Sequence, residues 1–109
     1  MTAFLKVERI SLKNTYLVIS SAGSNRDLSR GTREQRYWDE HSVFIDALVE
    51  EGFILLGGPL VEEGGAMIIV RATDEAEVRE KLRPDPWYEH EILKLESIKR
   101  WDIFIDQRD

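Results

Sequence analysis

The sequence predicts an α+β fold in which strands and helices follow one another in the order β-α-β-β-α-β. Three observations support this order: four short, apolar, β-rich runs; two segments with apolar residues at helical spacing; and turn signals rich in Gly, Pro and Asp between them. This order is typical of the ferredoxin-like arrangement, a four-stranded antiparallel sheet with both helices on one face.

The first half of the chain contains one strand, one long loop and one helix. The run TYLVIS predicts a central strand at residues 15–20, and the segment after it has glycines but no periodicity. A helix is predicted to start at Thr32, with Gln35 completing a capping box, and to continue to about residue 51. Gly52 supplies the glycine that commonly follows a helix end.

The second half begins with two strands that are expected to pair as a hairpin. They are predicted at residues 53–59 and 66–72, and Gly-Gly-Pro stops the first of them. Asp74 is expected to cap a short helix with a thin apolar face, which Pro84 ends because the residue before a proline avoids helical geometry.

The last strand is predicted at residues 92–105. Its apolar residues alternate, except that Ile98 is out of phase with the others. A one-residue insertion restores such a phase, so we expect a bulge near Ser97.

Composition limits the class of protein. With 109 residues the chain (1–109) is expected to form a single domain, with an N-terminal arm at residues 1–14 and a core at residues 15–105. A formal net charge of −6 disfavours nucleic-acid binding. No Cys and only two His disfavour a disulfide or metal site, so we expect neither a metal nor another cofactor. No apolar run approaches the ~18 residues of a membrane helix, and no signal peptide is evident, so we expect a cytoplasmic protein.

The predicted sheet has a second face that the two helices do not cover. Leu, Ile, Val and Trp are too abundant in the strands for that face to lie in water, and large apolar faces are covered by a partner. A second copy of the same sheet is the simplest cover, so we expect a homodimer.

Two side chains are candidates for acid-base chemistry. His41 follows Trp38 by three residues, which places it on the apolar face of the predicted helix. Asp85 lies between two prolines and is followed by two aromatic residues. An aspartate can fix the tautomer of a histidine and stabilise its protonated form, so His41 and Asp85 are predicted to form a general acid-base pair.

Each of the two residues also has a purely structural interpretation. His41 can be a core histidine that bonds to a backbone carbonyl. Asp85 suits the N-cap of a short helix with Pro86 at its first position, although one carboxylate oxygen can cap while the other orients a histidine. His90, flanked by two glutamates, is expected at the surface and is the weaker candidate.

Further residues are expected to contact a small-molecule ligand. The Gly-Gly-Pro segment either ends a strand or lets a ligand approach the backbone. The arginine-rich loop at residues 26–36 is either a solvated surface or a patch that favours anionic ligands. The residues expected to line the pocket come from one turn, two tryptophans and one arginine. They are Gly57, Gly58, Pro59, Trp38, Trp87 and Arg33.

Three motifs occur together in this order: a histidine in the first helix, GGP at the end of the second strand, and Asp-Pro-aromatic before the last strand. In the order of these three motifs, the chain resembles the YCII-related family over residues 16–101. The resemblance implies a dimeric α/β barrel, in which each sheet covers the other, and an active-site pair at His41 and Asp85. The sequence departs from the family at Trp87, where phenylalanine is usual, and in the arginine-rich loop and the N-terminal arm.

Members of that family include a dehydrochlorinase that acts on a chlorinated hydroxyquinol, and similar barrels include muconolactone isomerases. The resemblance therefore implies a cofactor-free lyase or isomerase that moves a proton on a small aromatic or lactone-like anion. The alternative is a non-catalytic homodimer that binds a small ligand or has a regulatory role. The two hypotheses differ in whether His41 is reachable from solvent and close to Asp85.

Overall fold

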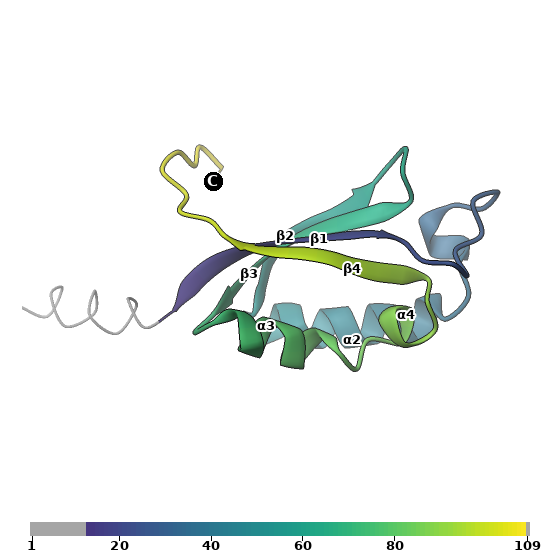
Figure 1. The fold of residues 1–109 in the computed structure, drawn as a ribbon, viewed down its shortest axis with the longest axis horizontal. Coiled ribbons are helices and arrows are strands. Elements are labelled where there is room, and N and C mark those ends of the chain that lie inside the picture. The colour runs from purple at the N-terminus through teal and green to yellow at the C-terminus, as the bar shows by residue number, and fades with distance from the viewer. Residues whose placement is uncertain (1–12, 109) are drawn as a thin grey trace, which may run out of the picture.

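The computed structural model describes residues 13–108. Its elements are β1 (Asn14–Ala22), the 3-10 turn η1 (Thr32–Glu34), α2 (Trp38–Glu50), β2 (Ile54–Leu60), β3 (Gly65–Ala72), α3 (Glu75–Leu82), α4 (Pro86–Glu89) and β4 (Leu93–Arg100). The strands form one antiparallel sheet in the order β2-β3-β1-β4, and the three helices lie together on one face of it (Figure 1). The predicted α+β class is confirmed, and the topology is compatible with a ferredoxin-like fold.

The core lies between the sheet and the helices. Alternate residues of β1 face the helices, and Val18 lies opposite Ile68 of β3 in the sheet register. Val70, Val78 and Leu82 are among the most deeply buried side chains, which shows that α3 packs directly on the central strands. Each such aliphatic side chain stabilises the fold by roughly 1.5–3 kcal/mol.

The first long helix begins later than the sequence predicts. Residues 32–34 form an isolated 3-10 turn, and α2 starts only at Trp38. The predicted capping pair, Thr32 and Gln35, does not form: the Gly31 N–H donates to the side chain of Glu34 at 3.0 Å, and Gln35 is buried. The Gln35 amide donates to the Asp27 carbonyl oxygen at 2.8 Å and accepts from the Asp27 N–H at 2.9 Å, so its backbone follows the loop and not a helix.

The loop between β1 and α2 is tied to the segment between α4 and β4. The Gly23 N–H donates to the Ile92 carbonyl oxygen and the Asn25 N–H to that of Glu91, both at 2.9 Å. A Cβ on Gly23 would lie 2.1 Å from the Glu91 oxygen, so this close approach requires glycine. The arginine-rich segment therefore starts from a fixed position beside α4 and β4.

The Gly-Gly-Pro segment does not end the second strand, as the sequence predicts, but lies inside β2. Because β2 is at the edge of the sheet, Pro59 costs no ladder hydrogen bond on its open side. The predicted hairpin of β2 and β3 is confirmed.

Local signals around the helices act as predicted. The Asp74 carboxylate accepts from the Glu77 N–H at 2.8 Å and caps α3. Gly52 follows α2 with a positive φ of 85°. The helix α3 ends at Leu82, two residues before Pro84.

The last strand is shorter than predicted, because β4 ends at Arg100 and residues 101–108 leave the sheet. The expected bulge is confirmed: Ile19 pairs with Ser97 and Ser20 with Leu95, which leaves one extra residue in β4. This shift turns Ile98 toward the core.

The predicted N-terminal arm lies largely outside the described residues. Asn14, its last residue, already belongs to β1. No helix in the described part of the chain is long and apolar enough to cross a membrane.

Candidate functional site

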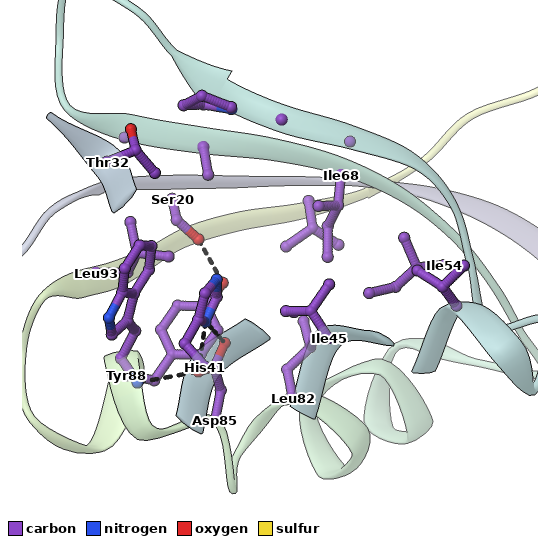
Figure 2. Close-up of a pocket in the computed structure, with 18 of the residues that line it drawn as sticks. Ser20, Thr32, His41, Ile45, Ile54, Ile68, Leu82, Asp85, Tyr88 and Leu93 are labelled. Carbon is purple, nitrogen blue, oxygen red and sulfur yellow. Dashed lines mark hydrogen bonds and ion pairs between the residues drawn. The ribbon is translucent and has the colours of Figure 1, made fainter. Parts of the chain in front are cut away.

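A cavity of about 380 Å³ lies between the sheet and α2, α3 and α4. Figure 2 shows its composition: Ile45, Ile54, Ile68 and Leu82 gather on one side, and the polar side chains of Ser20, His41, Asp85 and Tyr88 on the other. The cavity can therefore hold a small, largely apolar molecule while presenting hydrogen-bonding groups to one part of it.

The polar side of the cavity is centred on a contact between His41 and Asp85. The Nδ1 atom of His41 lies 2.8 Å from Oδ1 and 3.0 Å from Oδ2 of Asp85, and the Asp85 side chain is 1% exposed. A carboxylate only accepts hydrogen bonds, so Nδ1 carries a proton, and in the neutral form of the ring the lone pair is on Nε2. The predicted contact between these residues, 44 positions apart, is confirmed.

The second ring nitrogen of His41 can be reached from the cavity. Within residues 13–108, Arg26 Nε is the one fully buried side-chain polar atom without a hydrogen-bond partner. His41 Nε2 has no partner either, but it is not fully buried. It is therefore open to the cavity, toward which the ring points in Figure 2. The side chain of His41 is 12% exposed. His41 is thus accessible and bonded to a carboxylate, and not a sealed core histidine.

Asp85 is fixed by its position at the start of α4. Its Oδ1 also accepts from the Trp87 N–H at 2.9 Å, with Pro86 in the first turn of the helix, so the predicted N-cap is confirmed. Its backbone is extended, as expected before a proline. Capping and contact with His41 therefore occur in the same carboxylate.

Trp87 holds the His41 ring from the side. The indole and imidazole rings are parallel to within 8°, with centroids 3.7 Å apart. Trp38 packs at an angle against both rings. The Trp87 indole N–H donates to the Arg36 carbonyl oxygen at 2.8 Å, which fixes the plane of the stack.

A second polar pair adjoins the first. The hydroxyl oxygens of Ser20 and Tyr88 lie 2.5 Å apart (Figure 2). Burial raises the pKa of the Tyr88 phenol, the nearby Asp85 carboxylate adds to the rise, and the hydrogen bond with Ser20 opposes it. Tyr88 is therefore a protonated hydroxyl at neutral pH.

The structure brings most of the predicted ligand contacts to one cavity, but not all of them. Gly57, Gly58, Pro59, Trp38 and Trp87 line it together with the His41–Asp85 pair. Arg33 does not: its side chain is exposed and lies outside the cavity wall. His90 is exposed, as predicted, and stacks on Tyr37.

Three polar cavity residues were not predicted as ligand contacts: Ser20, Thr32 and Tyr88 all line the cavity. Arg26 lines it as well, and the sequence indicated it only as one of several arginines in the loop. Ser20 lies in phase with Tyr16 and Val18 on the helix-facing side of β1, and this alternation could have identified it. Arg26 and Thr32 lie in an irregular loop, where no periodicity indicates which side chains point inward.

In the described part of the chain, no three His, Cys, Asp or Glu side chains come close enough together to hold a metal ion. The expectation that the protein works without a metal stays a prediction.

No protein-family model matches the chain, and comparison with curated proteins finds no match. The resemblance to the YCII-related family therefore rests on the three sequence motifs.

Proposed function

We propose that the protein is a cofactor-free lyase or isomerase that moves a proton on a small organic anion. In this proposal His41 is the general acid-base and Asp85 its orienting partner. The observation that supports it best is that the two nitrogens of the His41 ring have different surroundings: Nδ1 is bonded to the buried carboxylate, and Nε2 faces the cavity with no hydrogen-bond partner among residues 13–108.

The chemical step follows from that arrangement. Nε2 of His41 takes a proton from a carbon next to a carbonyl or ring oxygen, and the Asp85 carboxylate stabilises the resulting imidazolium. In a lyase, the electron pair of the broken C–H bond forms a C=C bond while a leaving group such as chloride departs with the electrons of its own bond. In an isomerase, the imidazolium returns the proton to another carbon.

The Ser20–Tyr88 pair supports the same reaction. One of the two hydroxyls donates in the hydrogen bond between them, so the other keeps its own O–H for the ligand. A hydroxyl beside the acid-base pair can stabilise the negative charge that develops on an oxygen when the carbon loses its proton.

We also propose that the molecule is a homodimer in which the sheets cover each other, as the YCII resemblance implies. The face of the sheet away from the helices carries Leu17 and Ile19 of β1, paired with Ile69 and Met67 of β3. Met67 is 38% exposed in the single chain, and Phe104 and Ile105 in the C-terminal segment are more exposed still. Apolar area of this kind favours association.

A non-catalytic ligand-binding protein is the second candidate. The observation in its favour is the apolar side of the cavity, where Ile45, Ile54, Ile68 and Leu82 supply area for binding but no chemistry.

One experiment separates the two candidates. The protein is incubated in D₂O with a panel of small unsaturated lactones and chlorinated aromatic acids, and ¹H NMR follows the loss of C–H signals while a chloride assay follows elimination. We expect His41→Ala to slow the reaction of an active compound by roughly 10²–10⁴-fold, and Asp85→Asn to slow it as well. His90→Ala, at the other and exposed histidine, is the matched control and should have no effect.

Ligand-induced shifts in the protein spectrum without exchange or chloride release would favour the binding protein. Exchange that His41→Ala leaves unchanged would disprove the assigned role of His41.

A further inference from the structure

We infer that Arg26 is the residue that selects the ligand, by binding a carboxylate group at the loop side of the cavity. The inference rests on the proposed function, because it concerns the same cavity. It narrows the chemical class of the ligand to a carboxylate attached to a small apolar group. It assigns to Arg26 alone the anion-binding role that the sequence suggested for the arginine-rich loop.

The first observation is an unsatisfied hydrogen-bond donor. Arg26 Nε is fully buried and has no hydrogen-bond partner, the one such side-chain atom among residues 13–108. Arginine is always charged and can only donate, so a guanidinium without an acceptor is costly to bury. The two Nη atoms of Arg26 have no partner among the described residues either, but they are not fully buried, so these donors can meet a ligand in the cavity that Arg26 lines.

The second observation is the charge balance of the cavity wall. Its charged or titratable side chains are Arg26, His41, Asp85 and Tyr88, and Tyr88 is a neutral hydroxyl at neutral pH. The Asp85 carboxylate is already used by His41 and the Trp87 N–H, and Arg26 forms no ion pair with an acidic residue of the described chain. Arg26 therefore contributes a positive charge that no neighbour neutralises, whereas Arg30 in the same loop is paired with Asp27 at 3.3 Å.

The third observation is that the arginine is held in place. The backbone N–H of Arg26 donates to the Gly23 carbonyl oxygen at 3.1 Å, and the Gly23 N–H donates in turn to the Ile92 carbonyl oxygen. The side chain lies over the turn between β2 and β3, where a Cβ built on Gly64 would be 3.6 Å from Arg26 Nε. The backbone of Arg26 is thus fixed and Nε packs against the turn, which reduces the conformational freedom that the guanidinium loses when it binds a planar carboxylate.

These observations define the ligand by its chemistry. The carboxylate binds Arg26 at the loop, the apolar body lies against Ile45, Ile54 and Ile68, and the carbon that loses a proton faces His41. Arg26 is thus a specificity residue, and the chemical step remains with His41.

The test compares carboxylates with their neutral amides. Phenylacetate with phenylacetamide, and hexanoate with hexanamide, are titrated into the ¹⁵N-labelled full-length protein, and dissociation constants are obtained from NMR shifts. We expect the carboxylates to bind more tightly than the amides, and Arg26→Met to weaken carboxylate binding roughly 10- to 100-fold, as expected for loss of a charge-assisted hydrogen bond. Amide binding should not change.

Arg33→Met is the matched control, because Arg33 belongs to the same loop and is exposed outside the cavity wall. It should leave both ligand classes unaffected. Without ligand, Arg26→Met should not lower the melting temperature, since the arginine has no partner to lose. If this variant does not fold, Arg26→Lys, which keeps the charge but not the planar fork, should bind the carboxylates more weakly than the unmodified protein.

The Arg26 guanidinium N–H signals of the unmodified protein give a direct readout and should shift on addition of phenylacetate but not of phenylacetamide. Equal affinity for acid and amide, no carboxylate binding at millimolar concentration, or equal loss in the Arg26 and Arg33 variants would each overturn the inference. Any of these results leaves the proton-exchange test of His41 intact, because that test uses the unmodified loop.

Discussion

The imidazole of His41 lies flat against the indole of Trp87, with 3.7 Å between ring centroids. Trp87 also donates its backbone N–H to Asp85, the residue that bonds to the Nδ1 edge of the same imidazole. The three residues Asp85–Trp87 thus fix both the hydrogen bond and the stacking partner of His41, which explains why a bulky ring follows the Asp-Pro pair in this chain.

The contact between His41 and Asp85 predicts energetic coupling. His41→Ala and Asp85→Ala should be non-additive in the free energy of unfolding by roughly 0.5–3 kcal/mol, because either change alone leaves a buried partner unpaired. Urea denaturation of the two single variants and the double variant measures the coupling. Asp74 is the matched control: it also caps a helix but does not touch His41, so His41→Ala and Asp74→Ala should be additive. Additivity for Asp85 as well would reduce its role to that of a helix cap.

The indole of Trp87 predicts a graded response to substitution. Trp87→Phe should keep the stack on His41 but leave the Arg36 carbonyl without its donor, at a cost of about 1 kcal/mol in stability. Trp87→Ala should cost about 3–5 kcal/mol because it opens a cavity as well. Chemical denaturation measures both. Trp101→Phe, at a ring that is 40% exposed, should change stability by no more than about 0.5 kcal/mol, and a larger loss there than at Trp87 would contradict the assignment.

Two adjacent glycines in β2 predict opposite tolerance to alanine. A Cβ on Gly57 would lie 2.5 Å from Ile68 Cγ2, whereas a Cβ on Gly58 would meet nothing within 4 Å. We expect Gly57→Ala to destabilise the protein by roughly 1–3 kcal/mol, as overpacking does, and Gly58→Ala to be nearly neutral. Thermal unfolding of the two variants compares them directly. Equal effects would mean that Ile68 can move freely within the cavity.

The buried phenol of Tyr88 predicts a loss of stability at alkaline pH. Its pKa is raised above the usual 10.0, so the folded state holds the proton more tightly than the unfolded state does. This contribution is complete below pH 10 and is lost as the pH rises from there through the folded-state pKa. The measurement is the slope of unfolding free energy against pH above 10, which Tyr88→Phe should make less steep. A variant with the same slope would show that other groups cause the alkaline loss.

The proposed homodimer predicts a defined assembly. Sedimentation of the purified protein at micromolar concentration should show a dimer, since an obligate interface of this kind buries upward of ~2,000 Å² in total. Met67→Lys, on the face of the sheet away from the helices, should weaken it. Val43→Lys on the exposed side of α2 is the control and should leave the dimer intact. A stable monomer of the unmodified protein would refute the assembly.

The features that the sequence by itself determined depend on neighbours in the chain. The caps at Asp74 and Asp85 follow from carboxylates just before a helix, and the positive φ of Gly52 from the need to end one. The bulge in β4 follows from the phase of Ile98. Within the candidate site, His41 and Asp85 could be predicted because each lies in a local pattern, one on an apolar helix face and the other between two prolines.

What only the tertiary structure decided are the contacts that local patterns do not encode. Gln35 leaves the predicted helix because its amide bonds to the backbone of a loop eight residues away, and these hydrogen bonds outweigh a weak helical preference. Arg26, and not Arg33, reaches the cavity because Gly23 fixes the loop against residues 91–92, which lie between α4 and β4 and far from it in the sequence. The close packing of Trp87 on His41 has the same origin, since the fold alone brings together side chains separated by 46 positions.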